Sequence, residues 1–233
     1  ICSKIPPTEI KGIAAAIGIG GVMIVLILLQ PDLGSSLVYS VMLFAVLIAA
    51  GAPVKFLSGI VISILAMLPA AWMFLKPYQK MRLMVFLDPT IDPQGAGYNV
   101  IQSRIAVGSG GLFGKGFLHG TQGKLHFLPE PHTDFIFSVF SEEFGFIGCL
   151  VVLALFTVLL LRMLNVAYYT RETRGKLLSA GIVGWIWFQV TESIGMSMGL
   201  LPVTGLPLPL FSYGGSSLLA VAIALALIQS VVI

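Results

Sequence analysis

The sequence predicts an all-α integral membrane protein, and three observations support this fold class. Of the 233 residues, 57% are hydrophobic and 10% are charged, and the mean hydropathy is +0.99, whereas a typical soluble domain is about 25% charged. The apolar runs reach the ~20 residues that a helix needs to cross a bilayer. They also lack the alternation of apolar and polar residues that a membrane β-barrel requires. Helices, which satisfy their own backbone hydrogen bonds in lipid, are therefore expected.

Six membrane-spanning helices are predicted, each bounded by residues that favour turns or by charged residues. The predicted spans are 10–29, 33–50, 54–75, 134–161, 177–200 and 210–233. Prolines and glycines separate the first three, a basic connector at 162–176 precedes the fifth, and the turn LPVTGLPLP precedes the sixth. Residues 1–233 are thus expected to form a single polytopic membrane domain.

The segment 76–133 is the one long polar connection between predicted spans. Loops of this length in a compact protein are usually functional, and we expect a lid or a platform. The apolar stretches 81–87 and 100–107 predict short helices that lie on or dip into the membrane. The glycine-rich run GSGGLFGKG differs from a phosphate-binding loop, because Gly116 stands where a magnesium-binding Ser or Thr is required. We therefore predict no nucleotide cofactor and attribute these glycines to turns or to close backbone approach.

Basic residues in the short connectors predict the orientation of the chain. Arg162, Arg171, Arg174 and Lys176 crowd the connector before the fifth span, and the positive-inside rule places such a connector in the cytoplasm. The segment 76–133 then lies on the extracytoplasmic side. The net charge of +3 is mild and indicates no nucleic-acid partner. The chain opens without the features of a signal peptide, and Cys2 and Cys149 are too few for a disulfide framework.

The stretch LPEPHTDFIFSVFSEEFGFIG, residues 128–148, combines a proline-marked polar loop with an apolar helix. Thr133 is a good N-cap, so Asp134 is predicted at the helix N-terminus. At 100° per residue, Ser138, Ser141 and Gly145 follow Asp134 on the same side of the helix. On these residues alone, Asp134 could be either a functional carboxylate or a helix cap.

Four blocks of sequence resemble the signature motifs of the SEDS family, whose members act in shape, elongation, division and sporulation. The blocks are QPDLGSS (30–36), DPTIDPQGAGYNVIQSRIAVGSGGLFGKGFLHGTQ (88–122), LPEPHTDFIFSVFSEEFGFIG (128–148) and GLLPVTGLPLPLFSYGGSS (199–217). They follow the family's order over nearly the whole chain, and HGTQ is most similar to the elongation branch. The resemblance implies a fold of about ten spans, of which this chain corresponds to the C-terminal part.

The resemblance also implies an activity. Members of the family polymerise lipid II into glycan strands in the bacterial cytoplasmic membrane, with an active site that faces the extracytoplasmic side, and the aspartate of the HTDF block, here Asp134, is the catalytic residue. Glycosyl transfer with a pyrophosphate leaving group needs a general base and positive charge near the phosphates. A nearby helix end and cations are expected to lower the pKa of Asp134. The implied partners are lipid II, the growing glycan chain, membrane lipid and a class B penicillin-binding protein, and the implied cofactor is Mg²⁺ or Mn²⁺ with Asp134 as a candidate ligand.

Further polar residues are candidates for binding substrate. The predicted cationic cradle for the pyrophosphate consists of Lys80, Arg82, Arg104 and Lys124; the alternative role for each is to anchor the chain to lipid headgroups. The other predicted substrate-binding residues are Glu130, His132, Glu142, Ser212 and Gly214. Glu142 is included because a carboxylate at membrane depth is a functional candidate, whereas close helix packing is the alternative for Ser212 and Gly214.

Two features depart from the family pattern. The segment TESIGMSMG has Ser193 where the family usually has Asn, and the neighbouring Glu192 is also unusual, so no role is assigned to either residue. Glu9 and Lys11 resemble an upstream family motif only superficially, because they directly precede the first span. Two alternative functions follow from the same residues: a flippase for a lipid-linked precursor, or a non-catalytic scaffold for a class B penicillin-binding protein.

Overall fold

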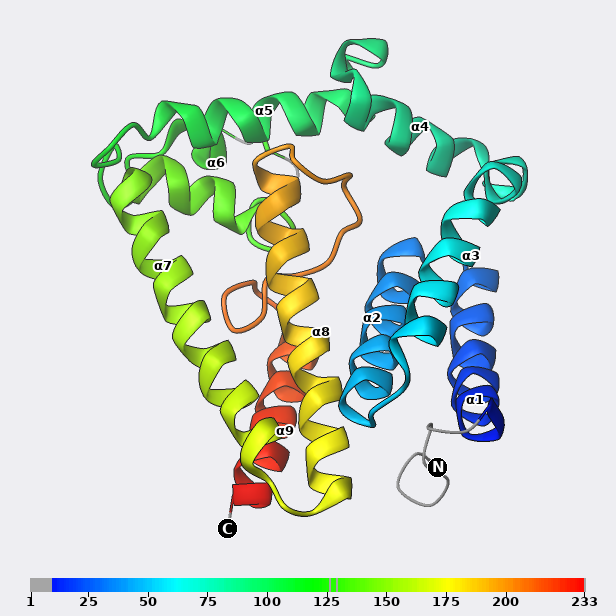
Figure 1. The fold of residues 1–233 in the computed structure, drawn as a ribbon. Helices are drawn as coiled ribbons and strands as arrows, with labels where there is room; N and C mark the ends of the chain where they lie inside the picture. Colours follow the sequence, from blue (N-terminus) through cyan, green and yellow to red (C-terminus); the bar gives the residue numbers. More distant parts are fainter. Residues whose placement is uncertain (1–9, 126, 129, 233) are drawn as a thin grey trace. The chain divides into compact units, whose positions relative to one another are not determined.

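The computed structural model describes residues 10–125, 127–128 and 130–232 (Figure 1). Cys2 and Glu9, and the side chain of Lys11, lie outside this description. The described residues form helices and contain no β-strand, as the predicted all-α fold class requires. The elements are α1 (Ile10–Leu29), α2 (Leu33–Ala49), α3 (Val54–Phe74), α4 (Pro77–Leu87), the 3-10 helix η1 (Pro89–Ile91), α5 (Ala96–Ser109), α6 (Thr121–Lys124), α7 (Ile136–Tyr169), α8 (Thr173–Ser197) and α9 (Gly215–Val232).

Six helices carry the apolar character that a membrane protein needs. Among the described residues, α1, α7 and α8 are long and apolar enough to cross a membrane, while α2, α3 and α9 provide shorter apolar segments. The first three helices begin where the sequence predicts and end within one residue of the predicted ends. The predicted helices around 81–87 and 100–107 are also present, as parts of α4 and α5.

The predicted boundaries of the last three spans were partly wrong, and the fifth span, predicted at 177–200, is α8 at Thr173–Ser197. Helix α7 continues to Tyr169, so only residues 170–172 separate it from α8. A single arginine at position 162 does not end a helix, and the residues that follow it are good helix formers. Helix α9 begins at Gly215 instead of residue 210, because Pro207 and Pro209 favour an extended or turning backbone immediately before that point.

The chain forms two compact units, which we describe separately. Unit 1 contains residues 10–74, 159–188 and 220–232. Its first two helices pack through Ala16, Leu47 and Ala52. On α8, Gly184 allows a close helix contact, because a Cβ at this position would lie 2.7 Å from the Ala45 Cβ of α2.

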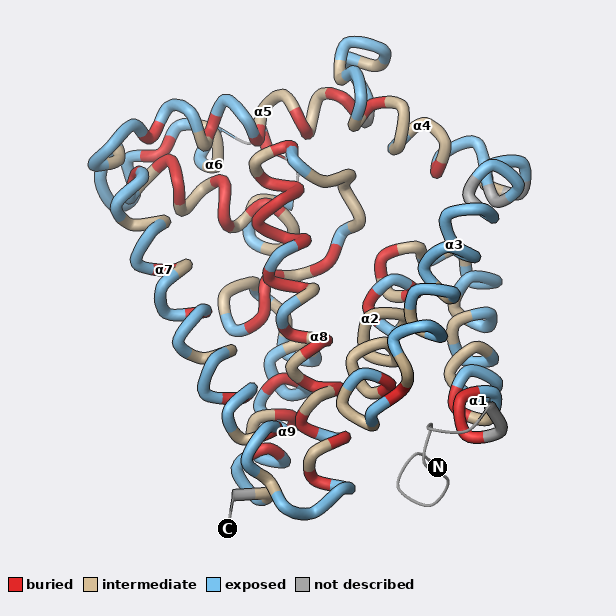
Figure 2. The backbone as a smooth tube through the Cα atoms, in the orientation of Figure 1, coloured by how far each residue is buried: buried red, intermediate tan, exposed pale blue. Residues whose placement is uncertain are grey.

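Unit 2 contains residues 75–158 and 189–219, and with them the sequence blocks 88–122, 128–148 and 199–217. A chain of buried hydrogen bonds ties three of its helices together. The Ser103 hydroxyl of α5 lies 2.7 Å from the Ser138 hydroxyl of α7 and donates to the Ser197 carbonyl of α8 at 2.6 Å. Figure 2 shows that buried residues concentrate on the last turns of α8 and the first turns of α7.

Helix α7 is broken at Gly145, where φ is 65° and ψ is −166°. The break leaves backbone groups without helical partners, and the glycine-rich run pairs with them. Lys115 N and Gly116 N donate to the Glu142 and Glu143 carbonyls at 3.0 Å, while Phe146 N donates to the Gly111 carbonyl at 2.9 Å. Gly111, Gly114 and Gly116 all adopt positive φ here, so these glycines form turns against α7, in agreement with the turn-forming role predicted for them.

Candidate active site

Asp134 lies in the turn 131–135 that immediately precedes α7. The predicted N-cap at Thr133 was wrong, because the helix begins at Ile136 and the Phe135 carbonyl accepts its first hydrogen bonds, from Ser138 N and Val139 N. The segment before α9 holds this turn in place. The Ser212 hydroxyl donates to the Thr133 carbonyl at 2.7 Å, and Tyr213 N donates to the His132 carbonyl at 2.9 Å.

The Asp134 carboxylate is half-buried beside Gly205, where a Cβ would lie in ordinary van der Waals contact with Asp134 Oδ2, at 3.4 Å. Burial raises the pKa of Asp134, and the negative charge of Glu130 adds to this effect. A hydrogen bond from Thr133 and the positive charge of Arg82 oppose it without cancelling it. The expected decrease in the pKa of Asp134 was therefore wrong, because desolvation outweighs the cations. A raised pKa makes Asp134 a stronger base than an ordinary aspartate.

A second carboxylate lies close enough to Asp134 to interact with it electrostatically. It belongs to Glu192, in the last turns of α8, which is 2% exposed. Its Oε1 accepts a hydrogen bond from the Thr204 hydroxyl. Its Oε2 is buried and has no hydrogen-bond partner among the described residues. Two neighbouring polar atoms of α8, Gln189 Oε1 and Ser193 Oγ, are likewise buried without partners in the described part of the chain.

Two arginines of the predicted cradle bind the segment that follows α8. Arg82 Nη1 donates to the Val203 carbonyl at 3.3 Å, and Arg104 Nη2 donates to the Gly199 carbonyl at 2.8 Å. Gly199 has a φ of 71°, and a Cβ at this position would overlap the Arg104 guanidinium. Only glycine therefore allows this close approach. The same segment carries Thr204 and Gly205, so it positions both arginines and both carboxylates.

Glu142 is placed differently from Asp134. It is fully buried, and its carboxylate accepts from Lys115 Nζ at 2.6 Å, from the Thr121 amide and hydroxyl at 2.9 Å, and from Gln122 N at 3.0 Å. These contacts fix the segment 115–122 against α7. These contacts give Glu142 a structural role in unit 2. The substrate-binding role expected from the sequence stays a prediction.

The remaining predicted residues lie in the loop before α7, on α4, on α6 and directly before α9. Glu130 lies in the same loop as Asp134 and accepts from the Thr133 hydroxyl. Lys80 precedes Arg82 by two residues on α4, and Lys124 is exposed at the end of α6. Gly214 lies directly before α9, and its carbonyl accepts from Leu218 N at 2.9 Å.

Neither Thr204 nor Gly205 was predicted from the sequence as a site residue, and no contact was predicted for Glu192. A signal was present, because Thr204 and Gly205 are the polar and turn-forming residues of an otherwise apolar, proline-rich run. Their contact with α8 and Asp134 depends on how the chain folds back, which spacing along the sequence does not encode.

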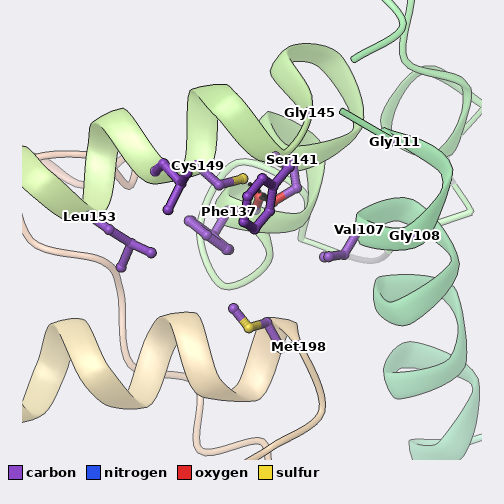
Figure 3. Close-up of a pocket in the computed structure, with 11 residues that line it drawn as sticks. Val107, Gly108, Gly111, Phe137, Ser141, Gly145, Cys149, Leu153 and Met198 are labelled. Carbon is purple, nitrogen blue, oxygen red and sulfur yellow. Dashed lines mark hydrogen bonds between the residues drawn. The ribbon is translucent and has the colours of Figure 1, made fainter. Parts of the chain in front are cut away.

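Unit 2 also contains an apolar cavity of about 180 Å³ (Figure 3). Val107, Phe137, Leu153 and Met198 extend into it, and Cys149 lies on its wall. The Ser141 hydroxyl donates to the Phe137 carbonyl at 2.7 Å and lies 3.1 Å from Cys149 Sγ. The polar atoms at this wall are thus paired with each other, and the cavity is apolar.

The carboxylates restrict which metal ion the site could hold. Within the described residues there is no group of three or more His, Cys, Asp or Glu side chains arranged to hold a metal. Zinc sites need such a group. Magnesium, in contrast, is commonly bound by one or two carboxylates together with substrate phosphates.

Comparison with known proteins identifies the family. The model of the FtsW/RodA/SpoVE family, described as cell cycle protein, matches residues 3–233. The chain belongs to this family. The relatives found carry the names MrdB, RodA, FtsW and stage V sporulation protein E.

Individual relatives of the family are similar over most of this chain. It is 43% identical to the peptidoglycan glycosyltransferase MrdB of Escherichia coli (strain K12), covering 97% of this chain and 61% of that protein. It is 48% identical to the peptidoglycan glycosyltransferase RodA of Treponema pallidum (strain Nichols), covering 67% of this chain and 36% of that protein. The chain therefore spans less than two thirds of either relative.

Solved structures of the family share the fold. A structure described as showing the structural coordination of polymerization and crosslinking by a peptidoglycan synthase complex is 38% identical with a TM-score of 0.77, covering 96% of this chain and 62% of that one. The crystal structure of the rod shape determining protein RodA of Thermus thermophilus is 33% identical with a TM-score of 0.59. The match covers 92% of this chain and 55% of that one. Together with the apolar helices, these relatives make the chain part of a multi-pass inner-membrane protein.

Proposed function

We propose that this chain is the catalytic part of a peptidoglycan glycosyltransferase that polymerises lipid II during cell elongation. The observation that carries the proposal is the half-buried Asp134 carboxylate, whose pKa is raised and which lies under the electrostatic influence of Arg82. The names of the MrdB and RodA relatives support the same activity.

The proposed reaction joins a sugar hydroxyl to the anomeric carbon of a glycan chain attached to undecaprenyl pyrophosphate. Asp134 removes the proton from the hydroxyl as the new carbon–oxygen bond forms. The bond between the anomeric carbon and the pyrophosphate oxygen breaks, and the pyrophosphate keeps its electron pair. A base of raised pKa matches this task, because proton transfer is most efficient when the pKa of the base approaches the working pH.

Arg82 and Arg104 are the proposed ligands of the leaving pyrophosphate. Both are exposed, and both are held by the backbone of the segment after α8. A guanidinium that is already oriented donates to phosphate oxygens with little further ordering. A divalent cation, when bound, would neutralise additional negative charge on the pyrophosphate.

The proposed setting is the extracytoplasmic face of the membrane, with a class B penicillin-binding protein as partner. The relative described as a peptidoglycan synthase complex, which couples polymerization and crosslinking, supports such a partner. A flippase is less well supported, because transporters place their charged sites near the middle of the membrane. Here Glu192 lies five residues before the end of α8, in the same unit as the Asp134 turn.

The decisive experiment replaces Asp134 by Asn in the purified full-length protein with its partner. Asparagine keeps the size and much of the hydrogen bonding of aspartate but is not a base. We expect normal membrane insertion and thermal stability, with polymerisation of lipid II reduced at least ~100-fold. Asp134→Glu is also expected to fail, because the longer side chain displaces the carboxylate from its aligned position.

Asp88→Asn provides a matched control, since Asp88 is an exposed aspartate whose carboxylate binds Thr90 N at 3.0 Å. This variant is expected to polymerise like the parent. Near-parental polymerisation by Asp134→Asn would reject the proposed base and leave transport or scaffolding as the better explanation.

A further inference from the structure

Unit 1 contains an open cleft of about 760 Å³ at the ends of three helices. Its lining residues come from the last turns of α7, from the turn 170–172 before α8 and from the last turn of α9. Figure 1 shows the ends of α7 and α9 and the start of α8 on the same side of this unit. Small-molecule sites commonly have volumes of about 300–1,000 Å³, so the cleft is large enough for a small ligand or a lipid headgroup.

Close packing of the helix ends holds the walls of the cleft. Gly175, in the first turn of α8, lies against the end of α9, because a Cβ there would be 2.6 Å from Val231 Cγ1 and 3.1 Å from Thr170 Cγ2. The Thr170 hydroxyl in turn donates to the Val166 carbonyl at 2.6 Å. Val166, Thr170 and Val231 all line the cleft, so the cleft is part of the packed structure of unit 1.

The charged side chains of the cleft are unbalanced. Arg162 and Arg171 both line it and are both exposed. In the part of the chain that the structure describes, neither arginine makes a hydrogen bond or an ion pair. Glu172 lines the same cleft and offsets the charge of only one arginine. The lining residues therefore carry a net positive charge that favours an anionic ligand.

The position of Arg162 indicates that the ligand comes from the membrane. Arg162 lies seven residues before the end of α7 at Tyr169, which is about 10 Å along the helix axis. Its neighbours Leu161 and Leu164 are exposed apolar side chains, on a helix long and apolar enough to cross a membrane. A guanidinium at such a depth is costly without a partner, and it extends along the helix towards the headgroups. A lipid phosphate is a partner available at that level.

Neutral side chains of the cleft fit the same level of the membrane. Tyr168 and Tyr169 are exposed, with their rings in edge contact at a centroid distance of 5.1 Å, and Tyr169 lines the cleft. Tyrosines concentrate where a membrane meets water. Asn165 and Gln229 also line the cleft, and their amides are donors for phosphate oxygens. The cleft thus combines charged and neutral donors of the kind that a lipid headgroup requires.

We propose that this cleft binds the headgroup of an anionic phospholipid, with Arg162 and Arg171 on its phosphate. A guanidinium donates parallel hydrogen bonds to two phosphate oxygens, and basic pockets between membrane helices are typical of headgroup sites. The acyl chains of the lipid contact the exposed leucines beside Arg162, a contact that inorganic phosphate cannot make. The cleft belongs to unit 1, whereas Asp134 belongs to unit 2, and the proposal does not rest on the glycosyltransferase function.

The test measures lipid binding to the purified full-length protein in detergent by native mass spectrometry. The probes are phosphatidylglycerol and phosphatidylcholine, which both have a phosphate and acyl chains, although only phosphatidylglycerol has a net negative charge. The parent is expected to bind phosphatidylglycerol at least ~10-fold more tightly than phosphatidylcholine. Combining Arg162→Gln with Arg171→Gln is expected to weaken the binding of phosphatidylglycerol at least ~10-fold.

Arg174→Gln is the matched control. Arg174 is also exposed and lies three residues from Arg171, but it is not among the described residues that line the cleft. This variant is expected to bind phosphatidylglycerol within about twofold of the parent, because solvent and salt screen an exposed charge outside the site. Glu172→Gln removes an acidic side chain from the cleft and is expected to bind phosphatidylglycerol more tightly than the parent.

Thermal unfolding provides a second measurement. A ligand that binds only the folded state raises the unfolding temperature. Phosphatidylglycerol is therefore expected to stabilise the parent and Arg174→Gln more than the variant that lacks both arginines of the cleft. The unfolding temperature of each variant without added lipid shows whether it is folded.

Three results would overturn the proposal. The first is equal affinity of the parent for the two lipids, and the second is an equal loss of phosphatidylglycerol binding in Arg174→Gln and in the variant that lacks Arg162 and Arg171. The third is stabilisation of the parent by inorganic phosphate or a polyglutamate peptide but not by phosphatidylglycerol. That result would assign the cleft to a soluble anion or to an acidic protein segment.

Discussion

The ionisation of Asp134 depends on neighbours whose effects oppose one another. Burial and Glu130 raise its pKa, whereas the Thr133 hydroxyl and Arg82 lower it. A general base is active only in its ionised form, so activity increases as the pH rises through this pKa. Because the pKa of Asp134 is above that of an ordinary aspartate, the acidic limb of the pH–rate profile should lie at a higher pH than a solvated carboxylate would give.

Neutralising Arg82 and neutralising Glu130 should shift the acidic limb of the pH–rate profile in opposite directions. Arg82→Gln removes a charge that favours the ionised carboxylate and is expected to shift the limb of kcat/KM to higher pH. Glu130→Gln removes a repulsive charge and is expected to shift it to lower pH. Glu172→Gln, in the turn before α8, is expected to leave the limb in place. Shifts of the first two variants in the same direction would contradict Asp134 as the titrating group.

The sequence motif already groups several of these residues, because Glu130, Thr133 and Asp134 lie within one five-residue stretch. The partnership of Glu192 with Thr204 was not predictable in this way. Two residues 12 positions apart meet there only because the chain turns back after α8. The direction of the pKa shift at Asp134 was missed for a related reason, since burial follows from tertiary packing.

At the scale of elements, α7 and the glycine-rich segment 111–116 are joined by backbone hydrogen bonds. Gly145 breaks the helix, and the segment 111–116 pairs with the freed backbone groups. Glu142 reinforces the junction through Lys115, Thr121 and Gln122. Turn-forming residues allowed the first three helix ends to be predicted, whereas this junction was not, because its hydrogen bonds join segments about 30 residues apart.

Replacing Glu142 by Gln should loosen the junction. The amide keeps the size of the side chain but loses the charge that attracts Lys115 and accepts fewer hydrogen bonds, so we expect a loss of about 1–3 kcal/mol of unfolding free energy. Hydrogen exchange should increase at 115–124. Lys115→Gln is expected to cost less, because the Lys115 side chain is 33% exposed and an exposed partner is screened by water.

Glu142→Gln also tests whether Glu142 binds substrate, as predicted from the sequence. A residue that only binds substrate would raise KM without changing hydrogen exchange at 115–124. Unchanged exchange in Glu142→Gln, at equal thermal stability, would contradict the structural role.

At the scale of the whole molecule, the basic residues around the α7–α8 turn determine the predicted orientation. Arg162, Arg171 and Glu172 line an open cleft of about 760 Å³ in unit 1 together with Gln229. The Asp134 turn belongs to the opposite end of α7, 35 residues before Tyr169. Helix α7 is long and apolar enough to cross a membrane, so we predict that a cytoplasmic α7–α8 turn would leave the candidate site on the extracytoplasmic side.

Cysteine labelling in intact protoplasts can measure this orientation. In a background with Cys2→Ser and Cys149→Ala, Gln94→Cys should react with a membrane-impermeant thiol reagent, and Thr173→Cys should react only after lysis. Both positions are exposed. Gly120 is a poor labelling position, because a Cβ there would lie 3.0 Å from Glu142 Oε2. Labelling of Thr173→Cys but not Gln94→Cys in intact protoplasts would invert the topology.

The break at Gly145 also limits how the glycine-rich segment 111–116 can move. If residues 111–116 separated from α7, four backbone hydrogen bonds would be lost at once, at a cost of about 1 kcal/mol each or more. The detached form would then account for fewer than about one molecule in a thousand. Residues 111–116 are therefore held against α7 in nearly all molecules, and this part of the segment is a fixed element of unit 2.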